Sequence, residues 1–158
     1  MAGDDTSPRL QDRYTCPDQM RYLAIDLGDK RTGIAVGDDE TGIASPVAGL
    51  PIAPGPALVR TILRAIEEHA PDALVLGLPL NMDGSEGTQA RRTRAFGAQL
   101  EAVIDRPLYY QDERLTSYAA EQRLAGSGRT HKQKKKVRDA LAAAEILEDF
   151  MNRLTPDA

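Results

Sequence analysis

The stretch Arg21-Tyr-Leu-Ala-Ile-Asp-Leu-Gly28 decides the fold, because its apolar, β-rich residues predict a central strand that nevertheless ends on a carboxylate, Asp26. A second run, Pro107 to Gln111, predicts another strand and is followed directly by Asp112 and Glu113. Acids gathered at strand ends repel one another and raise one another's pKa. A fold keeps such a cluster mainly to hold a divalent cation, which removes the repulsion.

The rest of the chain predicts an α/β protein with a mixed sheet. Three closely connected strands, Arg21 to Leu27, Thr32 to Gly37 and Ile43 to Leu50, predict an antiparallel meander, with Pro46 placing the third strand at an edge. Further strands are expected at 73–78 and 107–111, and helices at about 58–70, 85–103, 116–125 and 134–154, the second of these capped by Ser85. Helical crossovers make the fourth and fifth strands parallel to the first.

The last predicted helix carries a third acid on its apolar face. That face repeats at helical spacing through Asp139, Ala142, Ala143, Ile146, Leu147 and Phe150. Asp139 is the one charge in the stripe, which should pack on the sheet. Each acid also has an ordinary interpretation: Asp139 as a helix-start residue, Asp26 as a turn initiator, and Asp112 with Glu113 as a solvated loop. The acids form a functional site unless all three of these ordinary interpretations are correct.

Length and composition fit a single domain with a real core, over residues 21–154 of 158. Residues 1–20 are polar and aperiodic and predict a disordered N-terminal tail, not a signal peptide. Cys16 is the only cysteine, so neither a disulfide framework nor a cysteine metal site is expected. The longest apolar run, Ala73 to Leu80, is far below the roughly 20 residues that span a bilayer. These features predict a soluble cytoplasmic protein with no membrane partner.

The charge distribution predicts a nucleic-acid partner in spite of a net charge of −4. A basic segment, residues 129–138, contains six positive residues and no acid: Arg129, Lys132, Lys134, Lys135, Lys136 and Arg138. The rest of the chain therefore has a net charge of −10. Such a concentrated positive field is typical of phosphate-backbone binding, although a solvated charge run remains an alternative.

Other residues are candidates for holding a phosphate. Gly84, Ser85 and Gly87 lie in a loop that leads into a helix N-terminus, whose free N–H groups bind anions, although a plain glycine-rich helix start explains them equally well. Arg114, next to Glu113, is a further candidate for a phosphate contact. We interpret Arg91, Arg92 and Arg94 as a solvated helix face, and His69 and His131 as structural or surface residues.

Several of these segments together, in order, resemble the YqgF/RuvX family, the bacterial Holliday-junction-resolvase-like proteins now mostly described as pre-16S rRNA nucleases. The resemblance runs from about Arg21 to Leu154. Its motifs are Asp26-Leu-Gly-Asp-Lys-Arg-Thr-Gly-Ile-Ala35, Gly77-Leu-Pro79, Asp83-Gly-Ser-Glu-Gly87, Asp112-Glu-Arg-Leu-Thr116, and Asp139 with Ala142-Ala143 and Ile146-Leu147.

This resemblance implies a ribonuclease H-like fold with the five-stranded sheet order 3-2-1-4-5. It also implies that Asp26, Glu113 and Asp139 are catalytic, metal-binding carboxylates, with Asp112 as an additional candidate. Two Mg²⁺ or Mn²⁺ ions roughly 3.5–4 Å apart would then activate water and stabilise the leaving oxygen of a phosphodiester. The implied function is a metal-dependent endonuclease that processes the 5′ end of pre-16S rRNA during ribosome biogenesis.

Alternatives remain open at the level of sequence. Within the nuclease class, branched DNA is an alternative substrate, because metal-site chemistry is indifferent to the sugar. A non-catalytic RNA-binding module, associated with the small ribosomal subunit, would need the basic segment and not the acids. Asp26-Leu-Gly28 with Gly33 also resembles the phosphate loop of actin/Hsp70-like ATPases, but those enzymes close two such domains on a nucleotide. No long apolar stripe predicts a stable interface, so a monomer or weak dimer is expected.

Overall fold

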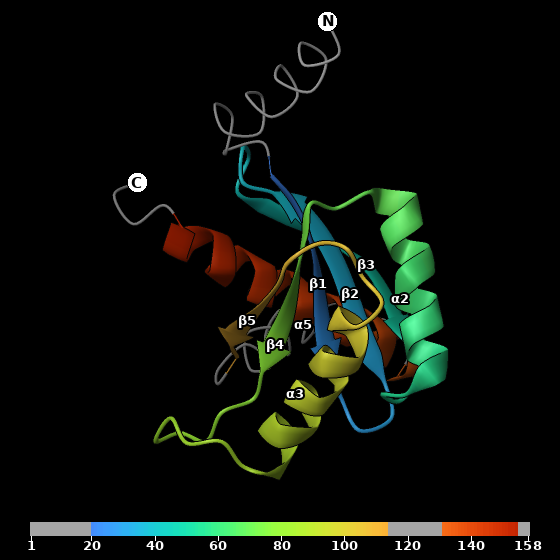
Figure 1. Ribbon diagram of the computed structural model, residues 1–158, viewed down its shortest axis with the longest axis vertical. Helices are drawn as coiled ribbons and strands as arrows, with labels where there is room; N and C mark the ends of the chain where they lie inside the picture. Colours follow the sequence, from blue (N-terminus) through green and yellow to red (C-terminus); the bar gives the residue numbers. More distant parts are fainter. Residues whose placement is uncertain (1–19, 114–130, 155–158) are drawn as a thin grey trace, which may run out of the picture.

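The computed structural model describes residues 20–113 and 131–154. These residues form a five-stranded sheet in the order β3-β2-β1-β4-β5, accompanied by helices (Figure 1). In chain order the elements are β1 (Arg21–Leu27), β2 (Thr32–Asp38), β3 (Ile43–Leu50), α2 (Pro56–His69), β4 (Ala73–Leu78), α3 (Thr88–Glu101), β5 (Leu108–Asp112) and α5 (His131–Leu154).

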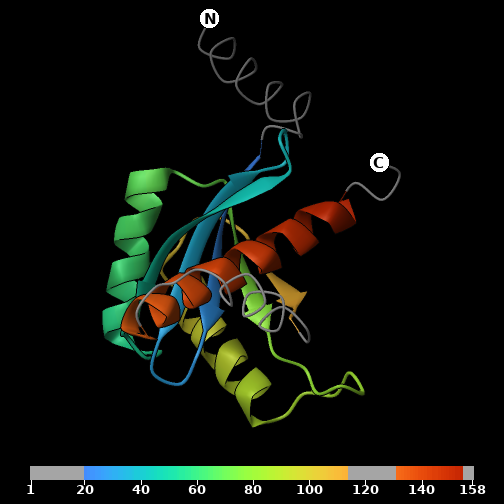
Figure 2. The ribbon, with the colours of Figure 1, turned by 180° about the vertical axis from the view of Figure 1, so that it is seen from behind.

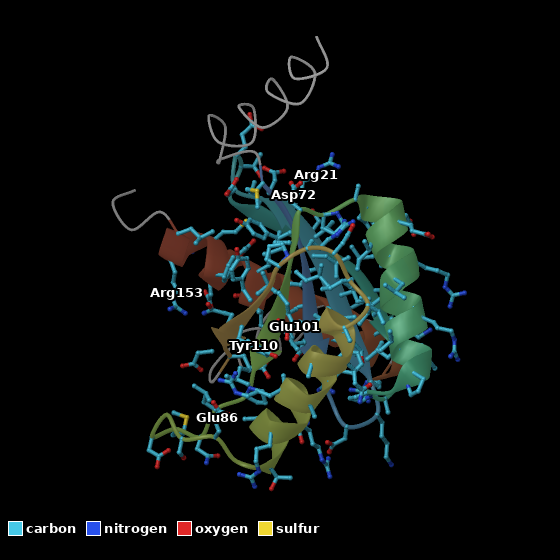
Figure 3. The ribbon with its side chains drawn as sticks, in the orientation of Figure 1. Arg21, Asp72, Glu86, Glu101, Tyr110 and Arg153 are labelled. Atoms are coloured by element: carbon cyan, nitrogen blue, oxygen red, sulfur yellow. The ribbon has the colours of Figure 1, made fainter. Side chains whose placement is uncertain are left out.

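The pairing of the strands confirms the mixed sheet and the order predicted from the sequence. β1 pairs with β2, and β2 with β3, in antiparallel register, which leaves β3 at an edge. β4 is parallel to both β1 and β5. The carboxyl ends of β1, β4 and β5 therefore lie at the same end of the sheet, where ligand sites of open α/β sheets are found. Arg21 and Asp72, labelled in Figure 3, mark the opposite end, where the Arg21 amide donates to Asp72 Oδ2 at 2.9 Å.

Helices cover both faces of the sheet. α2 and α3 lie on one face, and α5 crosses the other face diagonally (Figures 1 and 2). Alternation along β1 divides the core in two: Tyr22 and Ala24 pack with α5, whereas Leu23 and Ile25 pack with α2 and α3. By the same alternation Asp26 belongs to the α5 face.

Helix α5 approaches the sheet closely because two strands present glycines to it. A Cβ atom added at Gly49 on β3 would lie 2.8 Å from Lys136 Cα. A Cβ atom added at Gly33 on β2 would collide with the backbone carbonyl of Asp139. Backbone-to-strand contact of this kind fixes both the height of α5 above the sheet and its rotation about its own axis.

Several predicted boundaries are wrong in detail. α5 begins at His131, three residues before the predicted start, so Lys132 also lies on the helix. α3 begins at Thr88 after the N-cap Gly87, with no side-chain cap, so Ser85 does not cap it. The predicted helix at 116–125 and the predicted tail, apart from Met20, fall outside the described residues. Among the described helices, none is long and apolar enough to cross a bilayer.

We expect Gly33→Ala to destabilise the protein by about 3 kcal/mol, because the added methyl group would collide with the α5 backbone in a closely packed part of the core. Chemical denaturation would measure the change in the free energy of unfolding. Gly87→Ala is the matched control, since its Cβ would make only an ordinary 3.4 Å contact with the Asn81 side chain. Equal stability of the two variants would contradict the close contact of α5 with β2.

Candidate metal centre

Asp26 lies beside Asp139 because two features of the fold bring them together. Asp26 is directly opposite Gly33 in the β1–β2 register, and the α5 backbone at Asp139 sits over Gly33. Burial raises the pKa of the Asp26 carboxyl, and the negative charge of Asp139 raises it further. The predicted convergence of these two acids, from positions more than a hundred residues apart, is present in the fold.

Glu113 reaches the same place from the end of β5. Its amide donates to the Leu78 carbonyl oxygen at 3.2 Å, which continues the β4–β5 pairing by one residue. Its side chain lies over Gly77, where a Cβ atom would come within 2.8 Å of Glu113 Oε2. Burial, followed by the charge of Asp26, raises the pKa of Glu113 to about 10.

Asp26 and Glu113 share a hydrogen bond between their carboxyl groups. Because the pKa of Glu113 is high, Glu113 keeps its proton at neutral pH and donates it to Asp26. The shared proton reduces the electrostatic repulsion between these two closely spaced carboxyl groups.

Asp139 is held by a residue that the sequence analysis did not single out. Arg31, in the turn between β1 and β2, donates from Nε to Asp139 Oδ2 at 2.7 Å and from Nη2 to Oδ1 at 3.5 Å. This hydrogen bond raises the pKa of Arg31. The two residues are 108 positions apart in the sequence, so no local sequence pattern could have predicted their contact.

The donor set fits a divalent cation in its chemistry. As the side chains stand, no three acidic, histidine or cysteine residues of the described part are grouped tightly enough to hold a metal. Asp26 and Glu113 nevertheless supply carboxylate oxygens, which hard divalent cations prefer, and these two groups are hydrogen-bonded to each other. Asp139 is adjacent but is bound to Arg31.

Strand alternation separates the two acids at the end of β5. Gln111 faces α5, where its Oε1 accepts from Arg153 Nη1 at 2.9 Å; Arg153 projects from the last turn of that helix (Figure 3). Alternation then places Asp112 toward the α3 face and Glu113 toward α5. Asp112 still raises the pKa of Glu113 through its charge. This arrangement favours Glu113 over Asp112 as a metal ligand.

The basic segment is described only in part. Lys132, Lys134 and Lys135 belong to the first turns of α5. Lys136 is exposed beside Gly49, and Arg138 is partly buried just before Asp139. Arg114 and Arg129 lie outside the described residues. In the sequence of α5, these basic residues precede Asp139.

The loop between β4 and α3 is held by its own side chains. The Ser85 amide and hydroxyl both donate to Asp83 Oδ1, at 2.9 and 2.6 Å, and Asn81 Nδ2 donates to the same hydroxyl at 2.9 Å. Gly84 adopts a positive φ of 89° in the turn. The Ser85 amide and hydroxyl are already used in these hydrogen bonds. Phosphate binding by Gly84, Ser85 and Gly87 stays a prediction, and the N-terminus of α3 at Gly87 is its most suitable position.

Two arginines of α3 are less free than the interpretation as a solvated face suggested. Arg94 donates twice to the Glu86 carboxylate, both at 2.7 Å, and its guanidinium lies 4.9 Å from the centre of the Tyr110 ring. Glu86 and Tyr110 are labelled in Figure 3. Arg92 donates to Asp29 at 3.2 Å, with both side chains largely exposed. Arg94 thereby ties the loop to α3 and β5.

The sheet order and helix placement define a ribonuclease H-like fold of the RuvC resolvase type. A Thermus thermophilus RuvC bound to a Holliday junction superposes with a TM-score of 0.54 at 15% identity, covering 89% of this chain and 98% of that one. The fowlpox virus resolvase with its junction DNA gives 0.52 at 11% identity, covering 85% and 99%. These likenesses concern the fold.

The chain belongs to the RuvX/YqgF family, described as Holliday junction resolvases, whose profile matches residues 20–153. A Paracoccus denitrificans relative is 41% identical over 130 residues, which are 82% of each chain. A Thiobacillus denitrificans relative is 42% identical over 134 residues, covering 84% of this chain and 92% of that one. Both relatives are provisionally named pre-16S rRNA nucleases. The family expected from the sequence motifs is confirmed.

We expect the metal-free protein to lose stability as the pH rises from about 4.5 toward about 10. The pKa of Glu113 is raised to about 10, so the folded state binds more protons than the unfolded state across this window. Stability then falls with pH, by at most about 1.4 kcal/mol per pH unit for one proton. Melting temperatures measured with a chelator at several pH values would show the decline.

Glu113→Gln is the matched variant, because an amide keeps the shape and cannot ionise. Its melting temperature should rise relative to the unmodified protein as the pH increases, and the gap should close near pH 5. Parallel pH profiles for the two proteins would contradict the raised pKa of Glu113.

Proposed function

We propose that this protein is a metal-dependent endonuclease that cleaves structured RNA at the 5′ flank of the 16S rRNA precursor. The observation that carries the proposal is the convergence of Asp26, Glu113 and Asp139 on the α5 face, at the carboxyl end of the sheet. Membership of a nuclease family supports the reaction class. Ribosome assembly would place the protein in the cytoplasm, with the small-subunit precursor as partner.

The three acids have no evident structural reason to be together. Two carboxylates held close together repel each other, so their proximity does not by itself stabilise the fold. Cleavage of a phosphodiester, by contrast, needs hard oxygen ligands for Mg²⁺ or Mn²⁺ that leave room for water and substrate phosphate. Few carboxylates suffice for that purpose, and Asp26, Glu113 and Asp139 supply them.

The residues have distinct roles in this proposal. Bound Mg²⁺ or Mn²⁺ would activate water and neutralise charge on the scissile phosphate. Asp26, fixed on the central strand, would be the rigid ligand. Glu113, once deprotonated, would be the second ligand. Asp139 completes the set from α5, while the positive charges of the same helix guide the phosphate backbone to the site.

The choice of RNA over branched DNA rests on the relatives' names and on the surface. The relatives above 40% identity are named for pre-16S rRNA. Symmetric cleavage of a four-way junction requires two sites arranged by two-fold symmetry. Ile43 and Val47 lie on β3, and the other exposed large apolar residues of the described part lie in different segments of the chain, namely Met82, Val103, Tyr109 and Leu154. They do not follow one another along a single helix or strand as a long dimerisation stripe would.

Purified protein with Mg²⁺ or Mn²⁺ should cut RNA carrying the 5′ flank of a small-subunit precursor, in preference to a four-way DNA junction. Asp26→Asn should abolish the cleavage and leave metal-free stability unchanged or slightly higher, because it removes repulsion from Glu113 and Asp139. Asp29→Asn, in the exposed turn that follows, is the control and should cut normally.

Gel analysis of both substrates separates the candidate functions. Paired symmetric cuts in the junction, with intact precursor RNA, would favour a resolvase. Tight RNA binding without metal-dependent cleavage would favour a non-catalytic RNA-binding module, which is the hypothesis that needs only the basic segment. Cleavage retained by Asp26→Asn would remove the assigned site.

Replacing Lys134, Lys135 and Lys136 by alanine should weaken RNA binding without removing the chemistry. Each phosphate interaction that the substitutions remove should flatten the slope of log K against log salt by about 0.7–0.9. Binding titrations at several salt concentrations would measure the slope. The double variant Arg60→Ala/Arg64→Ala, on the exposed side of α2 across the sheet, is the control. An unchanged slope in the lysine variant would make these residues a solvated face.

A further inference from the structure

Arg31 occupies an unusual position, because it neutralises one of the three carboxylates that the proposed function assigns to the metal. Its guanidinium contacts both oxygens of Asp139, at 2.7 and 3.5 Å. Both carboxylate oxygens of Asp139 are therefore within hydrogen-bonding distance of the Arg31 guanidinium. Asp139 is thus paired with Arg31, whereas Asp26 and Glu113 are hydrogen-bonded to each other.

The turn that carries Arg31 is built to hold it there. The Gly28 amide donates to the Arg31 carbonyl oxygen at 2.8 Å, which closes the turn between β1 and β2. A Cβ atom at Gly28 would lie only 2.8 Å from that same oxygen, so the turn needs a glycine. The backbone of Arg31 is thus fixed one short turn beyond Asp26, and its side chain reaches Asp139 from a defined origin.

The ion pair can nevertheless exchange. The Arg31 side chain is 33% exposed and that of Asp139 is 15% exposed. A guanidinium with that much exposure can swing into water without opening the core, and a partly exposed ion pair is weak enough for a divalent cation to replace. The Asp26–Glu113 pair differs, since its two carboxyl groups are hydrogen-bonded to each other.

We propose that Arg31 is an internal counter-cation, which binds Asp139 in the metal-free protein and competes with the divalent metal for it. The inference rests on the proposed function, because it assumes that the carboxylates bind a metal. Its consequence is regulatory. Competition lowers metal affinity in the free protein and shifts metal loading toward the substrate complex, where phosphate oxygens add ligands and accept the released guanidinium.

Isothermal titration with Mn²⁺ tests the competition in the absence of any substrate. Arg31→Gln should bind Mn²⁺ about three- to tenfold more tightly than the unmodified protein, since it removes both a competitor and a positive charge. The Mn²⁺-induced rise in melting temperature should be larger in Arg31→Gln as well. Asp139→Asn should bind more weakly.

Arg92→Gln is the matched control, because Arg92 also pairs with an aspartate of the same turn, Asp29, at 3.2 Å, but away from the three carboxylates. Its Mn²⁺ affinity should equal that of the unmodified protein. Equal affinities for Arg31→Gln and the unmodified protein would reduce the ion pair to a structural contact and overturn this inference. The role of Asp26 in cleavage would still stand in that case.

Nuclear magnetic resonance of the unmodified protein with ¹⁵N-labelled arginine provides a test that needs no variant. The Arg31 Nε–H group should give a downfield signal in the metal-free state and move toward the free-arginine position as Mg²⁺ is added. Retention of the downfield signal at saturating Mg²⁺ would overturn the exchange. Absence of any Mn²⁺ or Mg²⁺ binding would overturn both this inference and the proposed nuclease.

Discussion

The close approach of the α5 backbone to the sheet is the constraint on which the site depends. Gly33 and Gly49 leave no side chain between strand and helix, so α5 lies directly on β2 and β3. Gly33 is also the register partner of Asp26. The same contact that packs the helix therefore sets Asp139 beside Asp26, and a side chain at Gly33 would disturb both the core and the acid cluster.

The electrostatics of the cluster follow from that packing. Three acids meet at one edge, and the protein compensates their repulsion in two ways: a proton on Glu113, shared with Asp26, and the guanidinium of Arg31 on Asp139. Neither device makes the arrangement favourable in itself, because burial still raises the pKa of Asp26 and of Glu113. Groups that are costly for stability and clustered at the carboxyl edge of a sheet are typical of functional sites.

The strands and the buried face of α5 could be predicted from the sequence, whereas the helix starts and the Arg31–Asp139 contact could not. Alternation predicted β1 and an unbroken apolar run predicted β4, both with correct ends, and the helical stripe through Asp139 predicted the buried face of α5. Helix starts were less well predicted, since Ser85 bonds within its loop and α5 begins at His131. That earlier start places Asp139 more than two turns inside α5, beyond the reach of the helix dipole. Arg31 was missed because its partner is distant in sequence.

Anomalous diffraction from crystals of the unmodified protein grown with Mn²⁺ tests the proposed metal centre most directly. The predicted result is a Mn²⁺ peak bounded by carboxylate oxygens of Asp26, Glu113 and Asp139, with the Arg31 side chain turned away from Asp139. A well-ordered structure at saturating Mn²⁺ that showed no peak there, with Glu113 still bonded to Asp26 and Arg31 still bonded to Asp139, would contradict it.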